Sequence, residues 1–138
     1  MTKISETDAF ILAAGLGTRM RHLTIDIPKP LIKVNGKSLI DYTLDDISSF
    51  GINNVVVNLH YKSADLIQHL ENVLKQKKTL KIKYSYEKDL LLDTGGGITK
   101  ALELISSDPF FIFNSDTIRV DFKRDYLTKM LDYWDAKK

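Results

Sequence analysis

The chain has 138 residues, with 20 lysines and arginines against 18 aspartates and glutamates, and it contains no cysteine. A chain of this length forms one domain and buries roughly two thirds of the surface of its unfolded state, so its core requires neither disulfides nor structural zinc. The lack of cysteine excludes thiol chemistry. A net charge of +2 without a basic block argues against nucleic-acid partners. We expect a single domain over residues 1–138.

We expect no targeting signal in the amino-terminal residues. Residues 1–8 are polar, and the apolar run over 9–14 is shorter than a signal-peptide core or a membrane span. The sequence predicts a soluble cytoplasmic protein with no membrane partner.

Apolar runs alternate with amphipathic stripes from the first residues onward. The continuous run over 9–14 predicts a strand buried on both faces. A helix follows, which Ser38 caps and Gly51 ends. The run over 54–58 predicts a second buried strand, and a helix that opens at Ser63 or Ala64 comes after it.

The second half of the chain repeats this order. Residues 80–84 alternate apolar and cationic side chains, which predicts a strand at a sheet edge. The run over 109–114 predicts another buried strand. Two helices are expected from apolar side chains at helical spacing, namely Ile98, Ala101, Leu102 and Ile105, and then Leu127, Met130, Leu131 and Trp134.

Strands and helices that alternate with short connections form parallel sheets with right-handed crossovers. The sequence therefore predicts a Rossmann-like, three-layer α/β/α fold with a mostly parallel sheet. Ligands bind such sheets at the carboxyl ends of the strands, and the loop after the first strand is the first place to search.

Five of the seven glycines fall in two expected loops, one of which follows the first strand. In that loop Gly15 and Gly17 allow backbone amides to approach a phosphate, Thr18 offers a hydroxyl, and Arg19 offers a fork of donors. The pattern is neither a P-loop nor a dinucleotide fingerprint. A G-x-G alone is equally compatible with a structural turn.

A long polar and cationic stretch extends from Arg19 to Lys33. Long loops of this kind tend to be functional or disordered, and here Pro28 and Pro30 restrict the backbone around Lys29. Lys29 is then either a charge held in place for a ligand or a solvated lysine in a rigid turn.

These segments together resemble the sugar-1-phosphate nucleotidyltransferase family. The matching motifs are LAAGLGTRMR over 12–21, PKPL over 28–31, DTGGG over 93–97 and NSD over 114–116. Within that family the combination is most similar to the N-acetylmuramate-1-phosphate uridylyltransferases, with mannose-1-phosphate guanylyltransferases close behind. The resemblance runs from about residue 9 to residue 116.

The resemblance implies a reaction and a set of roles. A nucleoside monophosphate moves from a triphosphate, UTP or GTP, to a sugar 1-phosphate of the N-acetylmuramate or mannose type, and pyrophosphate leaves. For the uridylyltransferase branch this implies a place in peptidoglycan recycling. Arg19 and Lys29 would be catalytic, and Asp116 would hold Mg²⁺. The nucleotide would contact Leu12, Ala13, Ala14, Gly15, Gly17, Thr18, Arg19, Lys29, Thr94, Gly95, Gly96 and Asn114.

Members of the family continue well beyond the position of Asp116, with a carboxyl-terminal half that contributes sugar contacts and a second metal-binding aspartate. The resemblance therefore implies a truncated nucleotidyltransferase fold. It leaves open the alternative of an inactive nucleotide-binding module that needs a partner to complete its site. We also expect self-association through an exposed carboxyl-terminal helix carrying Leu127, Met130, Leu131 and Trp134, because large exposed apolar patches mark interfaces.

Overall fold

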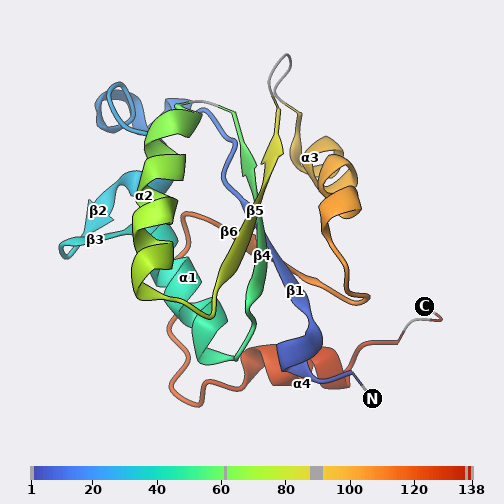
Figure 1. Cartoon of the computed structure of the whole chain (residues 1–138). Helices are drawn as coiled ribbons and strands as arrows, with labels where there is room; N and C mark the ends of the chain where they lie inside the picture. Colours follow the sequence, from blue (N-terminus) through green and yellow to red (C-terminus); the bar gives the residue numbers. More distant parts are fainter. Residues whose placement is uncertain (1, 61, 88–91, 136, 138) are drawn as a thin grey trace.

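The computed structural model describes residues 2–60, 62–87, 92–135 and 137. A four-stranded parallel sheet with the order β5-β4-β1-β6 runs through its centre (Figure 1). The strands are β1 (Asp8–Leu12), β4 (Asn54–Leu59), β5 (Lys81–Tyr86) and β6 (Phe111–Asn114). Each predicted strand is present, and β5 lies at an edge of the sheet, as its alternating pattern predicted.

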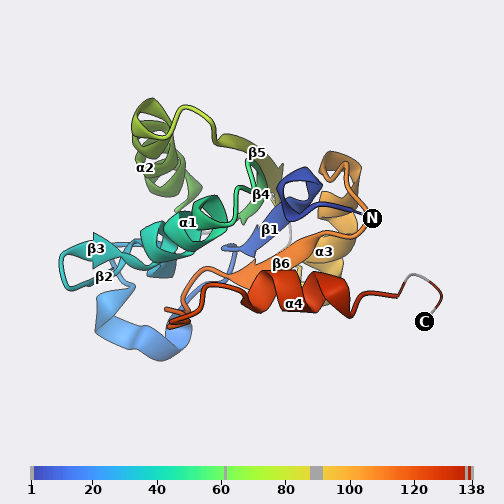
Figure 2. The same cartoon turned by 90° about the horizontal axis from the view of Figure 1, so that it is seen from below.

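Helices cover both faces of this sheet (Figures 1 and 2). Helices α1 (Leu39–Ser49) and α2 (Ser63–Gln76) pack on one face, and α3 (Thr94–Ala101) packs on the other. The larger core contains Ile11 and Val57 of the sheet, whereas the smaller core joins Phe10 and Val56 to Ala101 of α3. The chain therefore has the three-layer α/β/α architecture that the sequence predicted.

The start of α1 follows the predicted pattern. The Ser38 hydroxyl accepts a hydrogen bond from the Asp41 amide at 3.3 Å, which satisfies a donor that the helix itself cannot pair. Gly51 has a φ of 78°, a left-handed conformation that glycine adopts without steric cost after a helix end.

A short hairpin before α1 was not predicted. Strands β2 (Lys33–Val34) and β3 (Lys37–Ser38) pair antiparallel through a turn at Asn35 and Gly36, which have φ values of 51° and 77°. An Asn-Gly pair is the strongest short-range signal for such a turn. The two-residue strands are too short to show the alternation that usually reveals a hairpin.

The predicted glycine loop over 95–97 is instead the start of α3. The Asp93 carboxylate caps this helix by accepting the Gly96 amide at 3.2 Å, which offsets the low helix propensity of three glycines. The helix also ends earlier than predicted, since a 3₁₀ turn at Leu102–Leu104 follows Ala101 and leaves Leu102 exposed.

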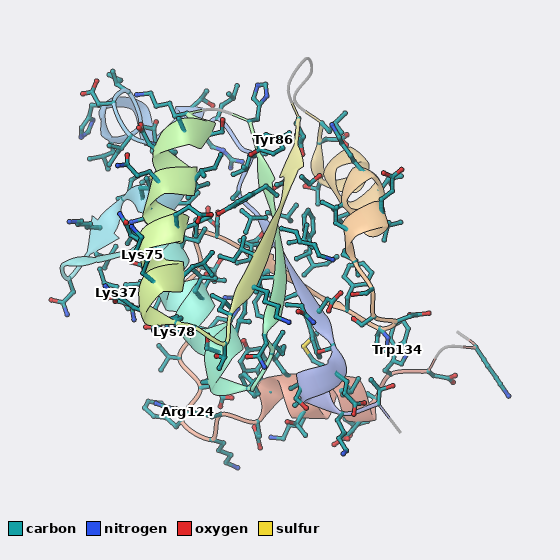
Figure 3. The ribbon with its side chains drawn as sticks, viewed as in Figure 1. Lys37, Lys75, Lys78, Tyr86, Arg124 and Trp134 are labelled. Atoms are coloured by element: carbon teal, nitrogen blue, oxygen red, sulfur yellow. The ribbon has the colours of Figure 1, made fainter. Side chains whose placement is uncertain are left out.

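The carboxyl-terminal helix α4 (Tyr126–Asp132) differs from the exposed stripe that we predicted. Leu127 is buried and Leu131 is half-buried against the larger core, whereas Met130 is exposed. Trp134 lies beyond the end of the helix and is exposed on the outside of the molecule (Figure 3). The expected self-association surface therefore loses Leu127 and Leu131. None of the helices within the described residues is long and apolar enough to cross a membrane.

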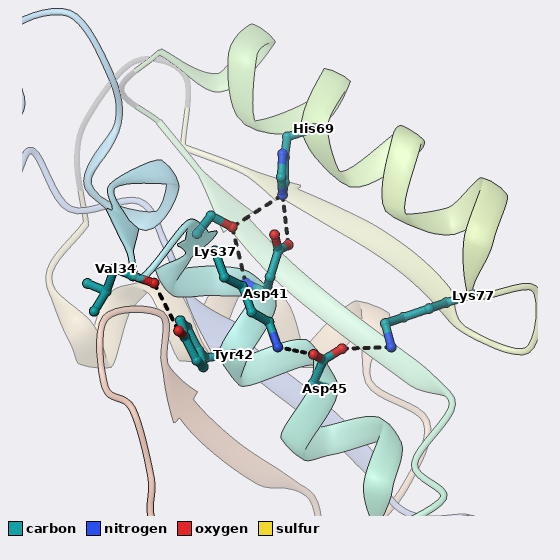
Figure 4. A network of polar contacts seen from close by, with 8 residues as sticks. Val34, Lys37, Asp41, Tyr42, Asp45, His69 and Lys77 are labelled. Carbon is teal, nitrogen blue, oxygen red and sulfur yellow. Dashed lines mark hydrogen bonds and ion pairs between the residues drawn. The ribbon is translucent and has the colours of Figure 1, made fainter.

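A polar network on α1 ties the helix to its neighbours (Figure 4). Asp45 pairs with Lys37 of β3 and, at 2.7 Å, with Lys77 at the end of α2, while His69 of α2 contacts Asp41 at 2.7 Å. Partial burial alone would raise the pKa of Asp45, but the two ammonium groups hold that pKa below its usual value. The carboxylate therefore joins the hairpin, α1 and α2.

Asp45→Asn should lower the free energy of unfolding at neutral pH by less than about 1 kcal/mol, since the ion pairs are partly exposed. A lowered pKa in the folded state stabilises the fold above the unfolded-state pKa, and this contribution is lost as the pH falls through the folded-state pKa. Thermal melts should therefore converge for variant and unaltered chain in strong acid. Asp26→Asn, at an exposed position, serves as the control, and a difference that persists in acid would contradict this account.

Candidate functional site

A cleft of about 530 Å³ opens at the carboxyl ends of β1, β4 and β6. Five segments line it, namely the end of β1 with its loop, the turn at Lys29, the end of β4 at Asn58, the amino-terminal end of α3 and the end of β6. The predicted site residues that line the cleft are Leu12, Ala13, Ala14, Gly15, Gly17, Thr18, Arg19, Lys29, Thr94, Asn114 and Asp116. Its lining reaches Thr94 but does not include Gly95 and Gly96.

The loop after β1 is packed onto the segment that carries Lys29. Gly17 has a φ of 66°, and a Cβ there would lie 2.9 Å from Thr24 Cγ2 and 3.1 Å from Lys29 Cβ. The Thr24 hydroxyl donates a hydrogen bond to the Gly17 carbonyl at 2.8 Å. Gly17 is therefore required both for the backbone conformation and for the close approach. By contrast, a Cβ on Gly15 would meet open space.

The last residues of the predicted first strand leave the sheet. The amides of Ala13 and Ala14 both donate to Oδ1 of Asn58, at 2.6 and 3.1 Å, although Asn58 belongs to β4. These two amides are therefore already paired, and donors for an anion in this loop come from Gly15 to Arg19.

Behind Asn58 lies a buried carboxylate. Glu87 is 1% exposed, accepts Asn58 Nδ2 at 2.8 Å with one oxygen, and accepts the Leu92 amide at 2.9 Å with the other. Sequence reasoning missed both Asn58 and Glu87, because their roles depend on strands that are far apart in the chain. A polar residue inside the apolar run over 55–59 was the one available signal.

Lys29 and Asp116 meet across the cleft. Lys29 Nζ lies 2.5 Å from Asp116 Oδ2, and their side chains are 31% and 33% exposed. Lys29 begins a 3₁₀ turn (Lys29–Leu31) after the extended backbone of Pro28. The Lys29 ammonium is therefore paired with a carboxylate at the cleft, and a role of Lys29 in binding a ligand stays a prediction.

Whether Mg²⁺ fits this cleft depends on which oxygen ligands its residues offer to a metal ion. Mg²⁺ takes oxygen ligands, commonly one or two carboxylates with substrate phosphates and water. Asp116 supplies one carboxylate, and Asp93, the other acidic residue in the lining, caps α3. The described residues contain no cluster of three or more potential metal ligands. The described residues of the cleft therefore fit Mg²⁺ held by one carboxylate and by phosphates.

The family model described as "Nucleotidyl transferase" matches residues 8–138. The chain belongs to the nucleotidyl transferase family. The resemblance to the sugar-1-phosphate nucleotidyltransferase family that the sequence motifs indicated is thus confirmed.

Two curated relatives are similar to this chain over most of its length. The N-acetylmuramate alpha-1-phosphate uridylyltransferase of Caulobacter vibrioides is 41% identical over 131 residues, which are 94% of this chain and 54% of the relative. The catalytic subunit beta of mannose-1-phosphate guanylyltransferase from Dictyostelium discoideum is 38% identical, over 80% of this chain and 30% of the relative. The chain therefore spans about half the length, or less, of these relatives.

Two solved structures have a similar fold over most of this chain. HddC from Yersinia pseudotuberculosis, complexed with GMP-PN, is 33% identical with a TM-score of 0.66, over 91% of this chain and 55% of that chain. A UTP-bound UGPase from Acinetobacter baumannii is 20% identical with a TM-score of 0.76, over 92% and 53% of the two chains. Because its sequence identity is only 20%, the similarity to the UGPase structure shows the fold alone.

Glycines 95 and 97 give a matched test of the packing behind the cleft. A Cβ on Gly97 would lie 2.9 Å from Glu87 Oε1 and 3.0 Å from Asn58 Nδ2, whereas a Cβ on Gly95 would meet open space. Gly97→Ala should lower the free energy of unfolding by about 1–3 kcal/mol, since both neighbours are held by hydrogen bonds. Gly95→Ala should raise it by up to about 1 kcal/mol through helix propensity. Chemical denaturation measures both, and equal effects would contradict the close packing at Gly97.

Proposed function

We propose that the cleft binds UTP and that the chain contributes the nucleotide-binding part of a transfer of UMP to a sugar 1-phosphate of the N-acetylmuramate type. The observation that carries the proposal is the ion pair of Lys29 and Asp116, which brings two matched family positions together across a cleft lined by the glycine loop. The 41% identity to a uridylyltransferase favours UTP and this sugar over GTP and mannose 1-phosphate.

The reaction joins two anions. A phosphate oxygen of the sugar 1-phosphate attacks the α-phosphorus of UTP, the bond from that phosphorus to the β-phosphate oxygen breaks, and pyrophosphate leaves. Catalysis consists mainly of positioning and of offsetting negative charge. Arg19 would hold the outer phosphates, Lys29 would hold the α-phosphate and the incoming phosphate, and Gly15, Gly17 and Thr18 would cradle the triphosphate.

Asp116 would hold Mg²⁺, with Asn114 supporting the same corner of the cleft. When bound, the metal would offset charge on the phosphates during transfer. The backbone of Leu12 to Ala14 and the start of α3, from Thr94 to Gly96, would face the base and ribose. These roles are carried over from the family, and the position of the cleft supports them for all but Gly95 and Gly96.

A second candidate function is a nucleotide-binding module that does not turn over without a partner. The observation that favours it is that, among the described residues that line the cleft, Asp116 is the one carboxylate that does not cap a helix. Both candidates require binding of a triphosphate, and they differ in whether the chain releases pyrophosphate.

Calorimetric titration with UTP and GTP, each with and without Mg²⁺, is the decisive experiment. We expect metal-dependent binding with UTP preferred. Adding N-acetylmuramate 1-phosphate should then release pyrophosphate, and binding without release would favour the module. A folded sample that binds neither triphosphate would overturn both candidates.

Arg19→Ala should weaken the binding of UTP more than that of UMP, because Arg19 is assigned to the outer phosphates. Titration of the two nucleotides measures the difference. Arg124→Ala, at an exposed position remote from the cleft lining (Figure 3), is the matched control and should change neither. Equal losses for both nucleotides would remove the assignment of Arg19.

Lys29→Ala should reduce the rate of pyrophosphate release by roughly 10²-fold or more, the scale for losing one preorganised charge donor. Coupled detection of pyrophosphate at saturating UTP measures this rate. Lys75→Ala, on the exposed face of α2 (Figure 3), is the control. A Lys29 variant as fast as the control would assign Lys29 to the fold alone.

A further inference from the structure

We propose that Asn58 and Glu87 form a buried positioning pair that fixes the base-binding end of the cleft and thereby sets the preference between UTP and GTP. The inference rests on the proposed function, in which the backbone of Ala13 and Ala14 faces the base. Neither Asn58 nor Glu87 belongs to the motifs that identified the family, and both are almost fully buried, at 4% and 1% exposure.

The pair connects the two walls of the cleft through one chain of hydrogen bonds. Asn58 Oδ1 accepts the amides of Ala13 and Ala14 on the β1 side. Asn58 Nδ2 donates to Glu87, whose second oxygen accepts the Leu92 amide just before α3. Leu12, Ala13 and Ala14 line one side of the cleft, and Leu92, Asp93 and Thr94 line the other. The spacing of the two walls thus depends on two side chains.

The pair cannot shift without a cost to the surrounding backbone. The first turn of α3 lies directly against it, because a Cβ on Gly97 would be 2.9 Å from Glu87 Oε1. The amino-terminal end of a helix favours a neighbouring negative charge, so α3 stabilises the carboxylate that it contacts. The Glu87 carbonyl is also engaged, since it accepts a hydrogen bond from His60 Nδ1. Hydrogen bonds and the close approach of α3 therefore restrict both side chains.

In the hydrogen bonds of Asn58 and Glu87, each side-chain atom can act only as a donor or only as an acceptor. Substitutions that exchange donors and acceptors therefore test the pair directly. Asn58→Asp keeps an acceptor for the Ala13 and Ala14 amides but places a second carboxylate oxygen opposite Glu87, where a donor stood. Adding Glu87→Gln reverses the direction of that hydrogen bond, because the glutamine amide can donate to the new carboxylate and its oxygen can accept the Leu92 amide. The double variant therefore restores complementarity with no change in net charge.

The test measures UTP and GTP affinities of the unaltered chain, of Asn58→Asp and of Asn58→Asp with Glu87→Gln. The single variant should bind UTP about tenfold more weakly, since a buried polar group loses its partner, and its ratio of UTP to GTP affinity should fall. In the double variant, both the UTP affinity and the ratio of UTP to GTP affinity should return to within about twofold of those of the unaltered chain. The control is Asn72→Asp with Glu103→Gln, which makes the same chemical changes at exposed positions.

Hydrogen exchange at the Ala13 and Ala14 amides gives a readout that needs no nucleotide. Both amides should exchange faster in Asn58→Asp, because repulsion by Glu87 displaces the new carboxylate from them. In the double variant this repulsion is removed, and exchange should return to that of the unaltered chain. A double variant that folds and binds normally supports the pair even if the single variant does not fold. A double variant that does not fold, or that binds as weakly as the single one, overturns the inference.

The two proposals fail in different ways. If the unaltered chain binds neither triphosphate, the proposed function fails. If it binds UTP normally and Asn58→Asp binds with the same affinity and the same preference for UTP over GTP, the positioning pair alone is wrong.

Discussion

Two amides at the end of β1 leave the sheet, and one side-chain oxygen accepts both of them. A buried, unpaired amide costs on the order of 1–3 kcal/mol, so a strand can turn away from its neighbours inside the protein only where another acceptor is supplied. Asn58 Oδ1 is that acceptor for Ala13 and Ala14. The direction in which the chain leaves β1, and therefore the whole course of the loop over 15–19, depends on this arrangement.

Much of this fold could be predicted from the sequence because the decisive signals are local. The continuous apolar runs are long enough to specify strands buried on both faces, and Ser38 and Gly51 mark the ends of α1 by backbone chemistry that operates over three or four residues. The glycine loop and the Pro28-Lys29-Pro30 segment were likewise visible as motifs. Their assembly into one cleft follows from the parallel order of β1 and β6.

The parts that sequence reasoning missed depend on contacts between distant residues. Three consecutive glycines predict a loop by propensity, yet Asp93 caps them into α3, and packing against Glu87 leaves no room for a side chain at Gly97. In α4, periodicity correctly places Leu127 and Leu131 on one face, but it cannot tell whether a core or a partner covers that face. Glu87 shows the same limit, because a lone glutamate after a half-exposed strand carries no local sign of burial.

The ion pair of Lys29 and Asp116 is weak enough for a bound ligand to separate it, which the proposed chemistry requires. Side chains that are about one-third exposed form ion pairs worth about 1 kcal/mol or less. Millimolar binding of a ligand already supplies about 4 kcal/mol, so a triphosphate with its metal can separate the pair at little cost. A fully buried pair would resist separation by several kilocalories per mole. Under the proposed function, the cleft would therefore keep both charges in place without a ligand and would release Lys29 to a phosphate and Asp116 to a metal. The buried pair of Asn58 and Glu87 behind it would stay fixed.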